Sequence, residues 1–517
     1  RLLRNLCGNL VEKFVSDQSV EWIKRDVPAM DEVEKMDETS GSLVKHSPFP
    51  ERNLLSGMSS YLGIKFSYKI LKSSEEVEDV EDIVYDPHSN VNDKQSSGTA
   101  SGKASTWKAI ANMTSFIQGA GAMALPYGVM KGGIATLIAF PLFALIHWYT
   151  GSVMINCIYG DEQEKQLSEY STPQPGKRKG AMGKRILRVR SSFSDLGEVL
   201  WPSHGRTLIE LLQAVDLSIF AVSHLIGSGS LMTYAFPTLG LSETWWTFII
   251  AVLVLPSTFV KDISCVAWQS LLGVASLAFM AGALAWFTVA NSSWFNFKHV
   301  LFWDTEGFLV GMGIVLYSYC VYSIVIPVEE TMSDRSKFRS ALGISLLSTT
   351  IFKVLFGLFG FLCFLDKTDE VIGNNFPSGL LRQLISVVYV MYVVFSYILI
   401  IYPVLQFIDG CQLKSEEVSF IPSFMWIPTT RFFVVLTTSV IAVTIPHFAL
   451  LTAFIGSLLL PCLEYVIPCL VHLKLKWVKL TRLEIFADIS VIVLGILWTV
   501  LCGYSSSKAL VITMVKQ

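Results

Sequence analysis

Hydrophobic and polar positions divide this chain into long apolar stretches separated by shorter polar segments. From about Thr106 onward the apolar stretches reach roughly 20 residues, the length of helix that crosses ~30 Å of hydrocarbon. The pattern predicts an all-α polytopic membrane protein with about eleven spans. The predicted spans lie at 107–129, 133–158, 208–235, 244–260, 267–290, 306–327, 341–365, 380–408, 431–446, 448–471 and 485–513.

Residues 1–105 differ from the rest because they are rich in Ser, Asn, Gly and charge, with an acidic run from Glu75 to Asp82. Such a segment cannot bury enough apolar surface to fold alone. We expect a cytosolic, largely disordered tail with an amphipathic helix at Leu10 to Ile23. A plain solvated tail and a signal that binds sorting or trafficking partners are both open. Because the chain begins at Arg1 without Met, its true N-terminus is expected to be missing.

The orientation of the predicted transmembrane domain, 106–517, follows from its basic loops. Lys and Arg concentrate in loops at 159–206 and 472–482, which the positive-inside rule places in the cytoplasm. An odd number of spans then puts the C-terminus on the luminal side. Asn291 begins an N-glycosylation acceptor sequence, Asn-Ser-Ser, in a loop predicted to be luminal.

Composition agrees with a membrane protein. The 517 residues are 52% hydrophobic and only 16% charged, and their mean hydropathy is +0.51. The net charge of −2, divided between an acidic tail and basic loops, gives no sign of nucleic-acid binding. The nine cysteines have no metal-ligand spacing, so we predict no metal site.

Two spans are interrupted by small and polar residues, the first at Gln118 to Pro126 and the sixth at Tyr317 to Pro327. Broken helices persist at membrane depth mainly where they line a protein cavity, and a separation of five spans suits an inverted five-plus-five repeat. Half-helix N-termini attract a carboxylate, and unwound carbonyls or an acidic side chain accept an ammonium. The pattern therefore favours an amino acid as a transported solute. The alternative is that the glycines only allow close helix packing.

Ionisable residues within spans are candidates for this function. Asp216 in the third span has no short route to either interface, so it is either a proton or substrate group or a structural carboxylate. Lys353 is expected to be a structural ion-pair partner or to extend to the cytoplasmic face. Glu329 suits capping, gating or transport chemistry. Glu464, between two prolines, is a candidate titrating group.

Three histidines, His147, His224 and His447, lie in or near spans. A lone membrane histidine is more often a hydrogen-bonded structural residue than a proton carrier, although imidazole titrates near neutral pH. We interpret Asp488 as a charge near the N-terminus of the last helix, where it would favour the helix dipole.

Several segments resemble the amino acid/auxin permease family. They are NMTSFIQGAGAMALPYGVMKGG at 112–133, HWYTGSVMINCIY at 147–159, SGSLM at 228–232, VLYSYCVYSIVIPVEETM at 315–332 and IPHFALL at 445–451. The resemblance covers about 105–515. It departs from the family pattern at Glu464, where an apolar or small residue is expected, at Asp216, where Glu is expected, and in the long basic loop.

The resemblance implies a fold of the amino acid permease/leucine-transporter type and a proton-driven exchanger. Such a protein would load small neutral amino acids, GABA and glycine, from the cytosol into acidic synaptic vesicles. Carried over by position, the implied substrate-binding residues are Thr114, Gln118, Gly119, Gly121, Ala122, Tyr317, Ser318, Tyr319 and Cys320. The proton-coupling candidates are Asp216, Glu329, Glu464 and His447.

Other functions stay open at this point. A proton-symport importer or lysosomal exporter of the same family would differ only in direction. A multi-pass membrane enzyme would need a His/Asp or Cys/His constellation at one interface, which the sequence does not show. A channel would also accommodate broken helices. No cofactor is predicted beyond a proton gradient, and participation of chloride is left open. The expected partners are the amino acid substrate and the lipid bilayer.

Overall fold

The computed structural model describes residues 104–161, 186–259, 266–290, 300–414 and 423–516. Most of the tail lies outside these residues, including the expected helix at Leu10 to Ile23 and the acidic run. The acceptor Asn291 and most of the basic residues of the 159–206 loop also lie outside them.

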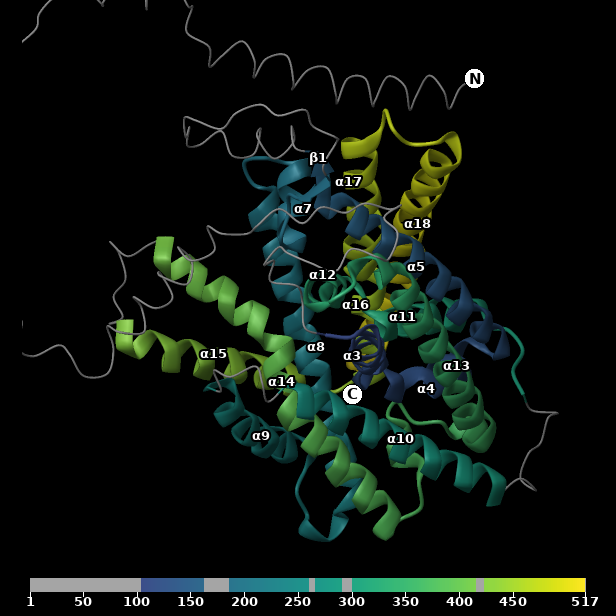
Figure 1. The fold of residues 1–517 in the computed structure, drawn as a ribbon. Coiled ribbons are helices and arrows are strands. Elements are labelled where there is room, and N and C mark those ends of the chain that lie inside the picture. Colours follow the sequence, from purple (N-terminus) through teal and green to yellow (C-terminus); the bar gives the residue numbers. More distant parts are fainter. Residues whose placement is uncertain (1–103, 162–185, 260–265, 291–299, 415–422, 517) are drawn as a thin grey trace, which may run out of the picture. The chain divides into compact units, whose positions relative to one another are not determined.

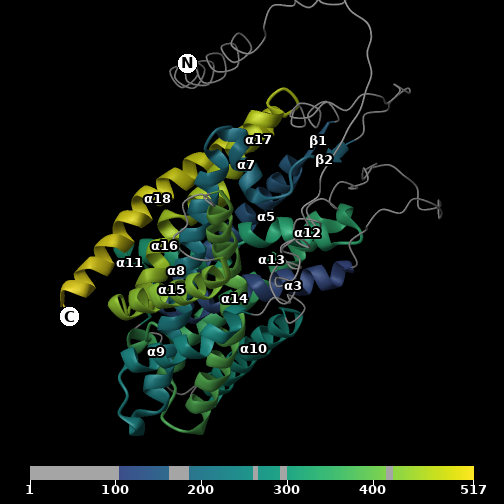
Figure 2. The same cartoon turned by 90° about the vertical axis from the view of Figure 1, so that its left-hand side faces the viewer.

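Helices make up nearly all of the described chain. Their bounds are α3 (Thr106–Gln118), α4 (Leu125–Gly132), α5 (Ala139–Ile158), α7 (Phe193–Leu200), α8 (Gly205–Ala235), α9 (Glu243–Val254), α10 (Val266–Ala290), α11 (Thr305–Tyr319), α12 (Tyr322–Thr331), α13 (Phe338–Phe364), α14 (Leu380–Lys414), α15 (Ser423–Thr444), α16 (Phe448–Leu458), α17 (Ile467–Lys476) and α18 (Arg482–Lys516). In both views, α7, β1 and α17 lie at one end of the bundle and α9 and α10 at the other (Figures 1 and 2).

Short turns extend or join these helices. The 3₁₀ turns are η2 (Ala120–Ala124), η3 (Ile134–Ile138), η4 (Pro237–Leu239), η5 (Leu255–Phe259), η9 (Arg335–Lys337), η10 (Leu365–Lys367) and η11 (Ile372–Asn375), and η12 (Cys462–Val466) is a π-helical turn. The strands β1 (Tyr159–Asp161) and β2 (Ile186–Arg188) form an antiparallel ribbon.

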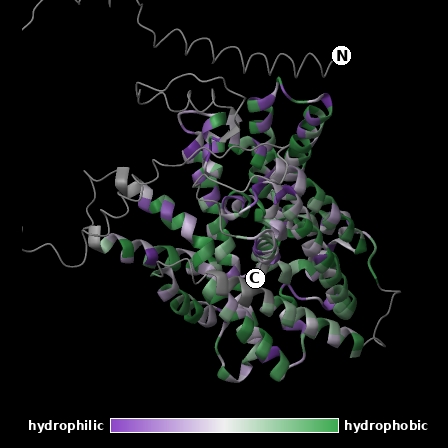
Figure 3. Cartoon of the chain, in the orientation of Figure 1, coloured by the Kyte–Doolittle hydropathy of each residue, from purple (hydrophilic) through white to green (hydrophobic). Residues whose placement is uncertain are grey.

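The predicted helical membrane protein is confirmed. Within the described residues, eight helices are long and apolar enough to cross a membrane, and the apolar helices Glu243–Phe259 and Ala275–Ala290 are shorter. The first predicted span is divided into α3 and α4. Hydrophobic residues run along the helices, while hydrophilic residues gather near α7, α17 and the start of α18 (Figure 3).

Both predicted interruptions are present. Helix α3 ends at Gln118, and η2 separates it from α4, which has Pro126 in its first turn. Helix α11 ends at Tyr319, and Cys320 then adopts a left-handed conformation with φ 32° before α12 begins. The breaks touch, because a Cβ added to Gly121 would lie 3.1 Å from the Tyr317 ring.

A third interruption, in the tenth span, was not predicted. The span divides into α16, the π-turn η12 and α17, with Pro461 just before the turn and Pro468 just after it. Proline lacks a backbone N–H donor and disturbs regular helical bonding, and π-turns insert a residue into a helix. The turn places Glu464 inside the bundle.

The 159–206 segment is more structured than a plain basic loop. It contains the β1–β2 ribbon and α7. A reciprocal capping box between Ser192 and Asp195 begins α7, and the helix packs against α8 and α17.

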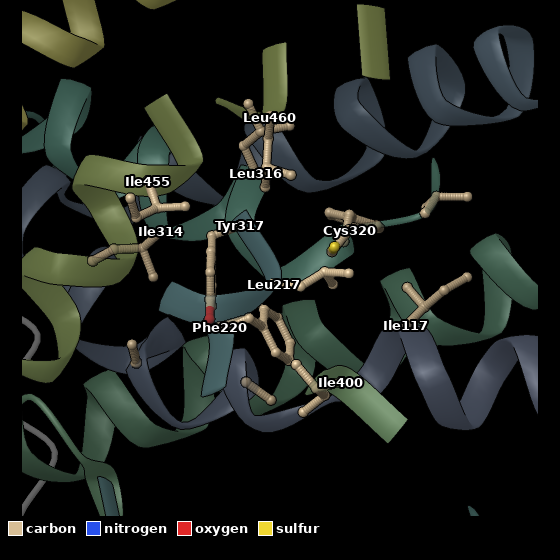
Figure 4. Packing of buried hydrophobic residues seen from close by; sticks show 14 of the residues in the cluster. Ile117, Leu217, Phe220, Ile314, Leu316, Tyr317, Cys320, Ile400, Ile455 and Leu460 are labelled. Carbon is tan, nitrogen blue, oxygen red and sulfur yellow. The ribbon is translucent and has the colours of Figure 1, made fainter. Parts of the chain in front are cut away.

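The core surrounds α11, which packs against α4, α16 and α18. Figure 4 shows the Tyr317 ring extending from α11 toward Phe220 of α8. The centres of these two rings are 5.0 Å apart. This packing holds the break of the sixth span against α8.

Candidate functional site

Lys353 of α13 joins the ends of the first halves of both broken helices. Its ammonium donates to the carbonyl oxygen of Ile117 at 3.0 Å, to that of Ser318 at 2.5 Å and to the Ser318 hydroxyl at 3.1 Å. The side chain is fully buried. Helix C-termini leave carbonyls without helical partners and carry partial negative charge. One ammonium therefore stabilises the C-terminal ends of α3 and α11 together.

This arrangement corrects the expectation for Lys353. No carboxylate of the described residues lies within 4.0 Å of its ammonium, so the expected ion pair is not formed. The side chain also does not extend to the cytoplasmic face, because backbone carbonyls at the two breaks satisfy it inside the protein.

Asp216 of α8 faces the second half of the sixth span. Its Oδ2 accepts a hydrogen bond of 2.7 Å from the Tyr322 hydroxyl, at the first residue of α12. Only 1% of the residue is exposed, and Oδ1 has no hydrogen-bond partner in the part of the chain that the structure describes. A buried carboxylate oxygen without a donor can take a proton or a cationic group at low cost.

Glu464 of the π-turn lies at the N-terminus of α12. Its Oε1 accepts from the backbone N–H of Val321 and, at 3.2 Å, from that of Tyr322. Its Oε2 lies 2.5 Å from Nε2 of His147 on α5, and both side chains are 1% exposed. The carboxylate thus caps the partially positive end of the half-helix. The sequence did not reveal that His147 and Glu464 meet.

Aromatic rings surround this arrangement. The Tyr317 hydroxyl hydrogen-bonds with that of Ser223 at 2.7 Å. Tyr319 stacks on His147 with ring centres 5.2 Å apart, and the Lys353 ammonium lies 4.1 Å from the centre of the Tyr319 ring. A cation over an aromatic face is attracted by the ring electrons. Tyr319 therefore contacts both the buried lysine and the histidine of the His147–Glu464 pair.

The residues implied for substrate binding lie at the two breaks or beside them. Gln118 ends α3, Gly119 follows it, and Gly121 and Ala122 belong to η2. Thr114 lies one turn earlier in α3, and its buried hydroxyl has no hydrogen-bond partner among the described residues. On the other side, Tyr317, Ser318 and Tyr319 end α11, and Cys320 is the residue after it.

The four coupling candidates do not form one cluster. Asp216 and Glu464 both contact the first residue of α12. Glu329, near the other end of α12, accepts from the Tyr159 hydroxyl and lies 3.9 Å from Arg188 and 3.8 Å from Arg335.

His447 lies elsewhere, at the start of α16. Its Nδ1 is 3.4 Å from Glu370, and that carboxylate accepts from the backbone N–H of Ala449 at 2.9 Å. The structure therefore distinguishes a central pair of carboxylates from two candidates at separate places.

A second buried histidine–carboxylate pair lies outside the breaks. Asp488 of α18 accepts from the Tyr149 hydroxyl at 2.7 Å and is 2.8 Å from Nδ1 of His472. It is fully buried, so it is a partner of α5 and α17 rather than only a charge near a helix end. In the described part of the chain, no group of three His, Cys, Asp or Glu side chains could hold a metal ion.

Comparison with known families decides the class. The family model for transmembrane amino acid transporter proteins matches residues 102–508. The chain belongs to this family. The resemblance noted in the sequence is therefore confirmed, and this family consists of transporters rather than enzymes.

Relatives give the same class, and solved structures with a similar fold are also found. The chain is 28% identical to the vesicular inhibitory amino acid transporter of Xenopus tropicalis over 406 residues, which cover 76% of this chain and 74% of that protein. It is 24% identical to the vesicular GABA transporter of Caenorhabditis elegans, with 77% and 78% covered. The inward-facing structure of Mhp1 is similar with a TM-score of 0.47 and 12% identity, covering 84% of this chain and 95% of that one.

Proposed function

We propose that this protein is a proton-coupled secondary active transporter of small neutral amino acids. Its first candidate substrates are GABA and glycine, loaded into acidic synaptic vesicles by exchange with luminal protons. The observation that carries the proposal is Asp216, a buried carboxylate of α8 that faces the break of the sixth span and has one oxygen with no donor among the described residues. The names of the relatives from Xenopus tropicalis and Caenorhabditis elegans support the substrate class.

Asp216 suits exchange because one oxygen can serve two ligands in turn. A proton on Oδ1 neutralises the buried carboxylate, and the ammonium of an amino acid does the same through a charged hydrogen bond. The two ligands compete for one position, so binding of substrate releases the proton. The opposite direction, proton symport by an importer or lysosomal exporter, would require both to bind together.

The ends of the half-helices support an amino acid as the substrate. Lys353 already satisfies the C-terminal ends of α3 and α11, and Glu464 already caps α12. The segment from Gly119 to Ala122, before α4, is then the position at which a substrate carboxylate would meet backbone N–H groups.

A proton gradient supplies enough free energy for this work. A ~100-fold difference in proton concentration is worth about 2.7 kcal/mol per proton. A membrane potential adds about 2.3 kcal/mol per elementary charge for each 100 mV. No cofactor is required beyond the gradient, and replacing chloride by gluconate tests whether chloride takes part.

The test is uptake of labelled GABA, glycine and alanine into proteoliposomes with an acidic interior, using the wild type and Asp216→Asn. We expect the wild type to accumulate at least one substrate and a protonophore to abolish the accumulation. In Asp216→Asn, the amide cannot take the proton or neutralise an ammonium, so gradient-driven uptake should fall at least tenfold.

Asp488→Asn is the matched control, because Asp488 is also buried and also accepts from a tyrosine hydroxyl at 2.7 Å. It should retain gradient-driven uptake. Wild-type failure with all three substrates would reject the substrate class. Normal coupled uptake by Asp216→Asn would reject Asp216 as the coupling residue. Uptake driven only by an acidic exterior would establish symport instead of exchange.

A further inference from the structure

The hydrogen bonds around His147 and Glu464 indicate that the two side chains share a proton. Nδ1 of His147 lies 2.7 Å from the carbonyl oxygen of Phe143, which can only accept, so Nδ1 carries a hydrogen. Nε2 lies 2.5 Å from Oε2 of Glu464. A contact this short between two lone pairs would be repulsive, so one more proton lies between the two atoms. The pair is either imidazolium with carboxylate or neutral imidazole with carboxylic acid.

The other oxygen of Glu464 holds the second half of the sixth span. It accepts from the backbone N–H groups of Val321 and Tyr322 at the N-terminus of α12. The Tyr322 hydroxyl in turn donates to Asp216 at 2.7 Å. One residue of α12 therefore contacts both central carboxylates, by its backbone and by its side chain.

We propose that the His147–Glu464 pair is a second proton-binding position of the transport cycle, and that its proton fixes the position of α12. This inference rests on the proposed proton-coupled transport and assigns His147 a positioning role. With the proton present, α5 and the π-turn are held together and Glu464 caps α12. When the proton leaves, the facing lone pairs repel, Glu464 moves away from His147 and the cap on α12 loosens. The movement reaches Asp216 through Tyr322.

Several groups that titrate or carry charge surround the pair and belong to the same electrostatic unit. They are Tyr319 and Cys320 at the break of the sixth span, Tyr322 on α12, Tyr465 on the π-turn, Lys353 on α13 and Asp216 on α8. On α18, which packs against the π-turn, Asp488 is engaged in its own contact with His472.

Glu464→Gln removes the shared proton but keeps the cap on α12. The amide oxygen can still accept from Val321 and Tyr322, and the amide nitrogen can donate to neutral His147. The variant therefore keeps both contacts without the proton shared between the two side chains. His147→Gln is the second variant, in which an amide nitrogen donates to Glu464 at every pH. Asp488→Asn is the matched control, since it changes the other buried histidine–carboxylate pair.

The first measurement is the melting temperature of the purified full chain from about pH 5 to about pH 8, the range in which imidazole ordinarily titrates. Only the folded wild type needs the shared proton, so its stability relative to Glu464→Gln should fall as the pH rises. The difference in melting temperature between the wild type and Asp488→Asn should not fall in this way as the pH rises. A difference in melting temperature that stays constant with pH, between the wild type and both pair variants, would overturn the proposal. This measurement needs no substrate.

The second measurement is the initial rate of amino acid counterflow at equal pH on both sides of the proteoliposome membrane. In Glu464→Gln, the loss of one proton-binding step should make the initial rate change less steeply with pH. Where the wild-type rate changes most steeply, the change per pH unit should be smaller by a factor of about ten in the variant. An unchanged profile in Glu464→Gln, with normal gradient-driven uptake, would reject the pair while leaving the proposed function intact. Absence of gradient-driven uptake in the wild type would instead reject the proposed function.

Discussion

Replacing Lys353 with methionine removes the only positive charge that the described structure places between the two breaks, while keeping a side chain of similar length. In the wild type the ammonium donates to two backbone carbonyls and one hydroxyl. Methionine donates to none of them. The carbonyl oxygens of Ile117 and Ser318 would then face each other as the uncompensated ends of two half-helices.

The expected loss of stability follows from these contacts. A buried acceptor that loses its partner costs about 1–3 kcal/mol, so two carbonyls cost about 2–6 kcal/mol. Burying an ammonium is itself expensive by several kcal/mol, and methionine removes that cost. The two effects oppose each other, and we expect a net destabilisation near the lower limit, about 2–3 kcal/mol.

Thermal unfolding of the purified protein measures this loss, and uptake into proteoliposomes measures its functional effect. Lys353→Met should melt several degrees below the wild type and lose transport, because α3 and α11 no longer share a cation. Lys508→Met is the control, since Lys508 pairs with Glu306 at 2.8 Å near the surface of α18 and should have little effect. If Lys353→Met had the stability and uptake of the wild type, the conclusion that Lys353 holds the ends of α3 and α11 together would be refuted.

Two further substitutions test local packing and capping. Gly456→Ala should destabilise the protein by about 1–3 kcal/mol in thermal unfolding, because the added Cβ would lie 2.2 Å from the Gly313 carbonyl oxygen, whereas Gly282→Ala meets nothing within 4 Å and should be neutral. Asp195→Ala removes a reciprocal cap of α7 and should cost about 0.5–2 kcal/mol near neutral pH. Burial raises the pKa of Asp195, but hydrogen bonds from Ser192 and Ser191 and the charge of Arg206 outweigh burial and leave the pKa below its ordinary value. The stabilisation is therefore fully present above the ordinary pKa of 3.8 and is lost as the pH falls through the lower folded value, so the difference between wild type and Asp195→Ala should shrink in acid. A difference that grows in acid, or a neutral Gly456→Ala, would contradict these arguments.

The helices and the two predicted breaks could be inferred because their signals are local. An apolar run of sufficient length specifies a span, and glycine with proline at Gln118 to Pro126 specifies an interruption. The capping box at Ser192 and Asp195 is also local, and it was a signal for α7 that the search for apolar spans passed over.

The contacts of the site depend on residues distant in sequence, which is why they were not predicted. His147 and Glu464 are 317 positions apart, and Lys353 meets Ile117 across 236 positions. Asp216 is a carboxylate within a predicted span, so an ion pair with Lys353 was the natural expectation from the sequence. Lys353 instead donates to backbone carbonyls. These carbonyls are available only because two helices end at the same place, which cannot be inferred by matching charged side chains in the sequence.

The position of Tyr322 explains how proton and substrate could act on one movement. Alternating access requires that each ligand bind more tightly to one conformation than to the other, typically with a coupling of about 1–3 kcal/mol. The backbone N–H of Tyr322 contacts Glu464 and its hydroxyl contacts Asp216, so a shift of α12 changes both carboxylates together. Lys353 holds α11 to α3 at the same break, and its hydrogen bonds to the described residues go to Ile117 and Ser318 rather than to α12. The first halves of the broken helices are thus joined by hydrogen bonds from Lys353, while the start of α12 is held by two carboxylates, which protons neutralise in the proposed mechanism. In the proposed mechanism, α12 rather than α11 is therefore the segment whose position a proton controls.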